Sequence, residues 1–175
     1  MRTRFLNLAL LAALLVGSAL VYPRLPDRIP GHFGLDGTPT RWVETSPASW
    51  FLLPLIALGL NLLLYAMAAL ATRDARFVNL PGKERLLALP IERQREVLRR
   101  VREGMDALMA PTTLAFCLIQ LAIYRSAIGM GGRVEIIAAL LLVLLGSTIG
   151  TISLLVRTQA ELDRQVRLEH EAAMS

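Results

Sequence analysis

Cysteine and histidine are scarce in this chain of 175 residues, and their scarcity excludes several kinds of site. The one cysteine, Cys117, lies inside an apolar run, so neither an intrachain disulfide nor a cysteine zinc cluster can form. The two histidines, His32 and His170, belong to no HExxH motif. A phosphate-binding loop, a dinucleotide fingerprint and a Gly-x-Ser-x-Gly elbow are also missing. We therefore predict no cofactor, no bound metal and no catalytic residue.

Charged residues are missing from four long apolar runs, in a chain of which hydrophobic residues make up 54%. Each run approaches the roughly 20 residues that a helix needs to cross a bilayer. Proton-coupled and ion-coupled carriers place ionisable groups at membrane depth, so the uncharged runs argue against that class. We predict an all-α membrane protein with four transmembrane helices in contact with the lipid bilayer, at about residues 5–22, 50–72, 107–124 and 136–156.

The first apolar run has two interpretations. Residues 17–19, Gly-Ser-Ala, resemble the small-residue cleavage site of a signal peptide. The run continues through apolar residues 20–22, which makes it long for a signal peptide. We expect an uncleaved membrane anchor.

The nineteen arginine and lysine residues are divided unevenly between the two sides of a four-helix topology. Fourteen lie on the side that holds the N terminus, residues 73–106 and the C-terminal tail, and five lie on the other side. Because the cytoplasmic side of membrane proteins collects positive charge, we expect both termini in the cytoplasm. The same asymmetry explains the net charge of +5, and no motif for binding nucleic acid accompanies it.

The alternation of apolar and polar segments predicts four regions. Residues 1–72 form a two-span region with an outer loop at 23–49, and residues 73–106 form a basic cytoplasmic connection. Residues 107–157 form a second helical pair. Residues 158–175 mix both signs of charge and are expected to extend the fourth helix into solvent as a cytoplasmic tail.

Residues 91–106 have the pattern of a basic amphipathic helix that runs into the third span. Apolar side chains share one helical face, and arginines lie around the rest. One interpretation is a helix that lies on the anionic inner leaflet of the membrane. The other is a docking face for a cytoplasmic regulator.

The outer loop is the least generic segment of the chain. Pro23, Pro26 and Pro30 fix the backbone at three nearby positions and favour an extended strap. The dipeptide Asp36-Gly37 then predicts a turn, and β-favouring residues follow it. We expect a small β-hairpin packed on the outer helix ends, with apolar contacts from Phe33, Leu35, Trp42 and Val43.

The loop also offers candidate functional side chains. A histidine with carboxylates nearby can bind a metal or move a proton, so one hypothesis is a membrane enzyme that uses His32 with Asp27 or Asp36. The turn explains Asp36 equally well, and a loop histidine more often hydrogen-bonds the backbone than ligates a metal. If the loop instead binds a ligand or partner, the candidate residues are Pro26, Pro30, His32, Phe33, Asp36, Gly37 and Trp42.

Gly146 and Gly150 lie four residues apart in the fourth apolar run, with serine and threonine around them. This GxxxG spacing lets helix backbones approach closely, so we predict a helix-packing face there. A structural subunit that assembles through this face, as a homo-oligomer or within a membrane complex, is a further hypothesis.

The outer loop contains a motif made of Leu25, Pro26, Ile29, Pro30, His32 and Phe33, followed by Gly37 and Trp42. With this motif it resembles the domain of unknown function 1648, the N-terminal part of SdpI-like membrane proteins. The resemblance implies a bacterial cell inner membrane protein, and in that family an immunity protein protects the cell from a secreted toxic peptide and holds a repressor at the membrane. It favours a non-enzymatic sensor or immunity-type protein that responds to an extracytoplasmic peptide or envelope component.

Overall fold

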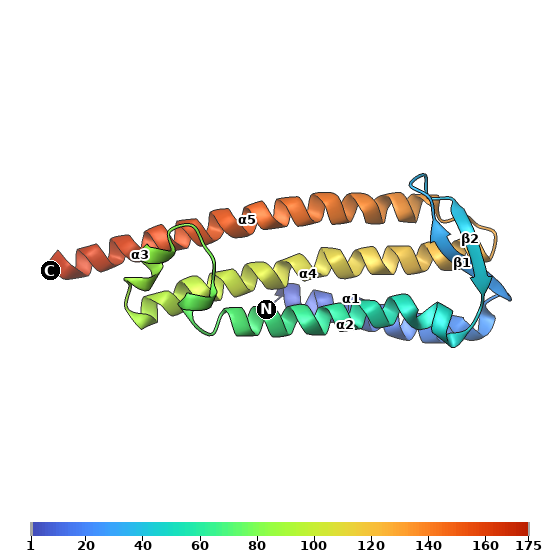
Figure 1. The fold of residues 1–175 in the computed structure, drawn as a ribbon, viewed down its shortest axis with the longest axis horizontal. Helices are drawn as coiled ribbons and strands as arrows, with labels where there is room; N and C mark the ends of the chain where they lie inside the picture. Colours follow the sequence, from blue (N-terminus) through green and yellow to red (C-terminus); the bar gives the residue numbers. More distant parts are fainter. Residues whose placement is uncertain (1, 175) are drawn as a thin grey trace. The chain divides into compact units, whose positions relative to one another are not determined.

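The computed structural model describes residues 2–174, most of which are helical (Figure 1). The four longest helices are each long and apolar enough to cross a membrane, which confirms the predicted multi-pass membrane protein. Between the first two lies a small two-stranded sheet. The elements are α1 (Arg2–Val21), η1 (Tyr22–Arg24), β1 (Arg28–Phe33), β2 (Pro39–Glu44), α2 (Pro47–Ala71), η2 (Ala75–Phe77), α3 (Lys83–Leu87), α4 (Ile91–Ala127) and α5 (Arg133–Met174).

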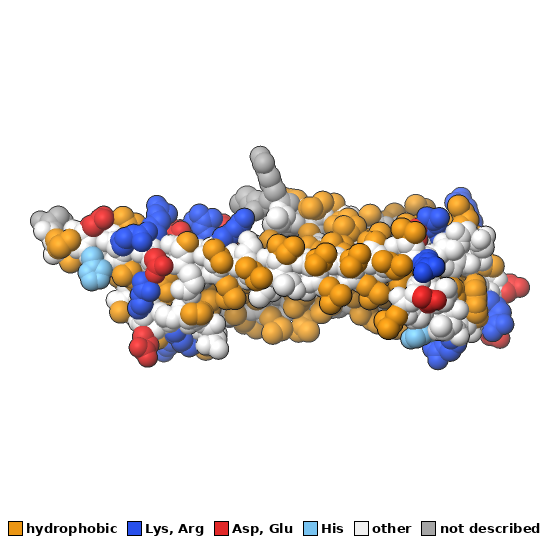
Figure 2. Space-filling view, turned by 90° about the horizontal axis from the view of Figure 1, so that it is seen from above, with side chains coloured by type: hydrophobic (Ala, Val, Ile, Leu, Met, Phe, Trp, Pro, Cys, Tyr) orange, Lys and Arg blue, Asp and Glu red, His pale blue; other side chains and the backbone are white. Residues whose placement is uncertain are grey.

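Two compact units share these elements. The first, which we call the hairpin unit, comprises Met1–Leu62 and Met109–Ser147. The second, the tail unit, comprises Leu63–Leu108 and Thr148–Ser175. Each unit therefore combines segments that are far apart in the sequence. Hydrophobic side chains cover the spanning stretches of the helices, and charged side chains gather outside those stretches (Figure 2).

In the hairpin unit, α1, α2 and α4 pack around small and apolar side chains. Leu11, Leu14 and Ala57 are buried at the centre of the cluster. Asn61 of α2 lies nearby and is 3% exposed. Its amide Nδ2 donates to the Thr113 hydroxyl at 3.1 Å, and so links α2 to α4. Polar side chains can hold spanning helices together because lipid offers them no alternative partner.

The start of α2 follows directly from its sequence. The Ser46 hydroxyl accepts the Ser49 backbone N–H at 3.1 Å, and the Ser49 hydroxyl accepts the Ser46 N–H at 2.9 Å. This reciprocal arrangement satisfies two backbone donors at the start of the helix. Pro54 lies inside α2, only two turns from its start.

The tail unit has a hydrophobic core of its own. Leu86 of α3, Val97 of α4 and Leu162 of α5 are fully buried within it. Arg85 pairs with Asp163 at 2.7 Å, and the Arg93 Nε donates to Glu169 at 2.6 Å. These ion pairs join the two segments of the unit around the rim of its core.

This core corrects two expectations. The apolar face of residues 91–106 packs inside the chain, since Val97, Leu98 and Val101 are at most 5% exposed. It is therefore not the lipid-facing surface that the inner-leaflet interpretation requires. Residues 158–174 are helical as expected, but one face of this tail is buried, with Thr158 and Leu162 at 0% exposure. Apolar periodicity shows that a face is buried without showing what covers it.

Candidate functional site

The predicted outer hairpin is present as two antiparallel strands. Ile29 pairs with Val43 and Pro30 pairs with Trp42, while the register shifts around His32. Ile29 is 1% exposed and anchors the hairpin by its apolar side chain. The hairpin base is closed by the Thr45 N–H, which donates to the Asp27 carbonyl at 2.8 Å.

The turn of the hairpin is built by Asp36 and Gly37, as the sequence predicts. The Asp36 Oδ1 accepts the Thr38 N–H at 3.1 Å and the Thr38 hydroxyl at 2.8 Å. These hydrogen bonds lower the pKa of Asp36 below its usual value, and the bond from the Thr38 backbone N–H has the larger effect. Gly37 has a φ of 76°, and a Cβ there would lie 2.9 Å from the Arg133 Cα at the start of α5. Only glycine meets both conditions without strain.

His32 also has a partner within the hairpin. Its Nδ1 lies 2.7 Å from the Thr40 hydroxyl on the neighbouring strand. The same hydroxyl donates to the His32 carbonyl at 3.4 Å. Among residues 2–174, no three side chains of the metal-ligating types lie close enough to hold an ion. The contacts of His32 are those of a residue that ties two strands together.

The remaining candidate residues differ in accessibility. Pro26 is exposed and its carbonyl accepts the Thr45 hydroxyl at 2.6 Å, whereas Pro30 is buried in β1. Phe33 is half-buried, and Trp42 is 39% exposed. Leu35 next to the turn is 91% exposed. The hairpin therefore exposes two large apolar side chains, Leu35 and Trp42, and the packing contact that the sequence predicted for Leu35 is wrong.

A polar groove lies at the base of the hairpin. It has a volume of about 770 Å³ and is lined by the ends of η1 and of both strands. Asp27, Arg28 and Glu44 supply charges of both signs to its walls. The Arg28 guanidinium also donates to the Trp42 carbonyl at 3.4 Å, so it holds β2 as well.

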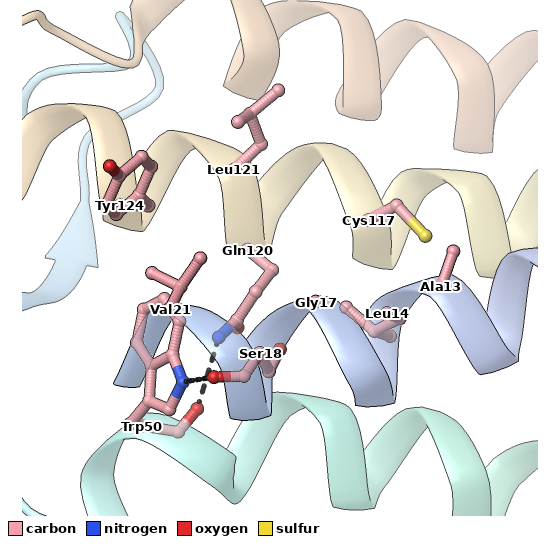
Figure 3. Close-up of a pocket in the computed structure, with 10 residues that line it drawn as sticks. All are labelled: Ala13, Leu14, Gly17, Ser18, Val21, Trp50, Cys117, Gln120, Leu121 and Tyr124. Atoms are coloured by element: carbon pink, nitrogen blue, oxygen red, sulfur yellow. Dashed lines mark hydrogen bonds between the residues drawn. The ribbon is translucent and has the colours of Figure 1, made fainter. Parts of the chain in front are cut away.

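A second pocket, which sequence patterns did not reveal, lies between α1, α2 and α4 (Figure 3). Its volume is about 240 Å³, and its walls are mostly apolar. The Trp50 Nε1 donates to the Ser18 carbonyl at 2.8 Å, and the Gln120 Nε2 donates to the Trp50 carbonyl at 3.3 Å. These two bonds join one residue from each of the three helices at the pocket wall.

Two polar atoms in that wall are unpaired. Ser18 and Gln120 are 3% and 5% exposed, and the Ser18 Oγ and Gln120 Oε1 have no hydrogen-bond partner among residues 2–174. Buried polar atoms are nearly always hydrogen-bonded, so an unpaired pair in one pocket is a signal of function. The only trace in the sequence is the presence of serine and glutamine inside apolar runs.

Gly146 and Gly150 both face α4 of the same chain. In the hairpin unit, a Cβ at Gly146 would lie 3.2 Å from the Pro111 Cβ. In the tail unit, a Cβ at Gly150 would lie 2.2 Å from the Leu108 Cδ2. The small residues thus allow α5 to approach α4 closely. Assembly with a second chain through this face stays a prediction.

The outward face of residues 91–106 carries charge. Arg99 pairs with Glu96 at 2.8 Å and with Glu103 at 2.7 Å. Hydrogen bonding to Glu96, followed by that to Glu103, raises the pKa of Arg99. Arg95 is exposed on the same helix. This charged face is the part of the helix that a partner could reach.

Comparison with known proteins finds one match, to a protein family. Residues 8–58 match a family described as a domain of unknown function, DUF1648. The matched segment holds most of α1, the whole hairpin and the first half of α2. No curated protein and no solved structure matches the chain.

Proposed function

We propose that this chain is a non-enzymatic sensor or immunity-type protein of a bacterial cytoplasmic membrane. In this proposal the hairpin meets an extracytoplasmic peptide or envelope component, and the tail unit interacts with a cytoplasmic regulator. The observation that carries it is the exposure of Leu35 and Trp42 on a hairpin whose polar candidates are engaged in its own structure.

The distribution of charge supports the orientation. Fourteen of the nineteen arginine and lysine residues lie in the N terminus, in residues 73–106 or after residue 156. By the positive-inside rule these segments belong in the cytoplasm, and the hairpin belongs outside. Trp50 at the start of α2 and Tyr124 near the end of α4 suit the membrane boundary on the hairpin side.

The hairpin has the properties of a recognition surface. Leu35 is 91% exposed and Trp42 is 39% exposed, and large exposed apolar side chains are common contact residues in interfaces. The sheet has only two strands among the described residues, so each strand has an edge at which an extended peptide can add. The charged groove at the hairpin base offers partners for charges on the same peptide.

The tail unit supports the second half of the proposal. Its core keeps residues 91–106 folded without a lipid surface, because Leu86, Val97 and Leu162 are fully buried. Its exterior carries the exposed Arg95 and the paired Arg99. A folded, charged surface is a suitable docking site for an acidic region of a regulator.

The sequence resemblance agrees with this role. The Leu25 to Trp42 motif that resembles SdpI-like proteins lies entirely within the residues that match the domain of unknown function. One immunity protein of that family protects the cell from a secreted toxic peptide. We extend that role to this chain as part of the proposal.

The test is a growth experiment combined with co-purification. We expect bacteria that express the intact chain to survive a secreted antimicrobial peptide better than cells without it. The double substitution Leu35→Ser with Trp42→Ser should remove this protection, while Arg41→Gln on the same strand should not. Arg95→Glu should lower recovery of a co-purified regulator with the hairpin intact. Equal survival of intact and hairpin-variant cells across the peptides tested would contradict the proposal.

A further inference from the structure

The pocket between α1, α2 and α4 is accessible from the lipid side of the helices. Leu121 at its edge is 44% exposed, and Ala13 is also exposed, although both lie within membrane-spanning helices. Figure 3 shows their side chains at the margin of the pocket, with Cys117 between them. In a membrane this exposed surface faces hydrocarbon, so an occupant enters from the bilayer.

The polar part of the pocket selects the chemistry of that occupant. The Gln120 Nε2 is already engaged by the Trp50 carbonyl, so the unpaired Oε1 requires a donor. The unpaired Ser18 hydroxyl can both donate and accept. An ester or ether oxygen cannot donate to Gln120. A hydroxyl group can donate to Gln120 and accept from Ser18.

The position and size of the pocket suit an amphiphile. Ser18 precedes the end of α1 at Val21 by three residues, or about 5 Å at 1.5 Å per residue, which places it near the membrane boundary. The apolar wall continues from there to Ala13 and Cys117. A volume of about 240 Å³ is below that of sites for drug-sized ligands, about 300–1,000 Å³, and suits part of a single alkyl chain.

We propose that this pocket binds the hydroxyl end of a long-chain lipid alcohol from the bilayer. The hydroxyl group donates to the Gln120 Oε1 and accepts from the Ser18 hydroxyl. The first part of the alkyl chain lies along Gly17, Leu14 and Cys117. This binding does not depend on the proposed role of the hairpin in peptide recognition.

Trp50 provides the readout, because it lines the pocket and is 2% exposed. With Trp42→Phe it is the remaining tryptophan of the two in the chain. The probe is 6-bromododecan-1-ol, whose bromine lies on the half of the chain next to the hydroxyl group and quenches tryptophan fluorescence at short range, added to protein in phosphatidylcholine nanodiscs. The matched probe is its methyl ether, which lacks the donor. We expect saturable quenching by the alcohol, and about tenfold weaker binding of the ether because it leaves the Gln120 Oε1 unpaired.

Two glycines supply a variant that blocks the pocket and a matched control. A Cβ at Gly17 or at Gly59 would meet no atom of the described residues within 4 Å, so both positions accept a side chain. Gly17 lines the pocket, whereas Gly59 does not. Gly17→Leu should abolish saturable quenching and Gly59→Leu should preserve it. Gln120→Leu should make the alcohol and the ether bind equally.

Three results would overturn the proposal. Equal quenching in the two leucine variants would mean that the probe only partitions into lipid. Equal affinity of alcohol and ether for the intact pocket would mean that Ser18 and Gln120 do not select a hydroxyl, for instance because water bridges them. Non-saturable quenching in every sample would mean that no alcohol site exists there. The comparison of the alcohol with its ether uses the unaltered pocket, so it tests the proposal even where a variant fails to fold.

Discussion

The Asn7 side chain of α1 donates its amide to the Asn61 Oδ1 of α2 at 2.7 Å, and both side chains are at most 3% exposed. Asn61 in turn donates to the Thr113 hydroxyl of α4 at 3.1 Å. One asparagine therefore connects three helices of the hairpin unit through side chains. Hydrogen bonds between spanning helices contribute about 0.6 kcal/mol on average and up to about 1.7 kcal/mol.

Replacing Asn61 tests this connection. Asn61→Leu should destabilise the protein by about 1–2 kcal/mol in an unfolding titration in detergent, because it leaves the Asn7 amide and the Thr113 hydroxyl without this partner. Asn7→Leu with Asn61→Leu should cost less than the sum of the single changes. Ser147→Ala is the control, since the Ser147 hydroxyl donates to the Val143 carbonyl of its own helix. Additive effects would show that the two asparagines are not coupled.

The tail unit should depend strongly on its small core. Leu86 is 0% exposed and its neighbour Leu87 is 42% exposed, so the two form a matched pair in α3. Leu86→Ala should destabilise the unit by about 2–5 kcal/mol and speed proteolysis within residues 73–106. Leu87→Ala should change either quantity little. Equal proteolysis rates for the two variants would contradict a core centred on Leu86.

Gly150 should be needed for packing within one chain. Gly150→Leu should destabilise the protein by about 1–3 kcal/mol, because a Cβ there would lie 2.2 Å from the Leu108 Cδ2. Gly59→Leu is the matched control, since a Cβ at Gly59 meets no atom of the described residues within 4 Å. If Gly150→Leu instead dissociates an oligomer without changing the unfolding transition, the glycine pair serves assembly between chains.

The carboxyl group of Asp74 should titrate at unusually low pH. The Arg76 side chain first, and then its backbone N–H, lowers the pKa of Asp74 from 3.8 to about 2. Because Asp74 binds fewer protons in the folded state than in the unfolded state, its ionised carboxylate stabilises the fold above about pH 4. This stabilisation is lost as the pH falls through about 2. NMR titration should show Arg76→Ala raising this pKa part of the way, with Arg85→Ala as the control. An ordinary pKa in the intact chain would contradict the Asp74–Arg76 contact.

Local sequence signals predicted those features of the fold that depend on neighbouring residues. Uncharged apolar runs predicted the four spanning helices, and Asp36-Gly37 predicted the hairpin turn. The same Asp36 was a candidate for catalysis, yet its oxygens bond to Thr38. Short-range hydrogen bonding of this kind can be inferred from sequence because both partners lie within two residues.

Features that depend on helix rotation and long-range pairing could not be inferred in this way. Trp50 and Gln120 are 70 residues apart, and the contact between them depends on which faces of α2 and α4 meet. In lipid, hydrophobicity does not distinguish these faces, because Leu packs as well against lipid as against a helix. Burial of Leu162 in the tail unit was missed because the surrounding charged residues suggested a solvated helix.

By the proposed orientation, the hairpin is reached from outside a bacterial cytoplasmic membrane, and residues 73–106 are reached from the cytoplasm. Single cysteines introduced into a Cys117→Ser chain test it, at Leu35 with 91% exposure and at Phe77 with 69% exposure. In intact cells without an outer-membrane barrier, a membrane-impermeant maleimide should label Leu35→Cys at once, and label Phe77→Cys only after the cells are permeabilised. Labelling of Phe77→Cys but not Leu35→Cys in intact cells, or of both together, would contradict the account.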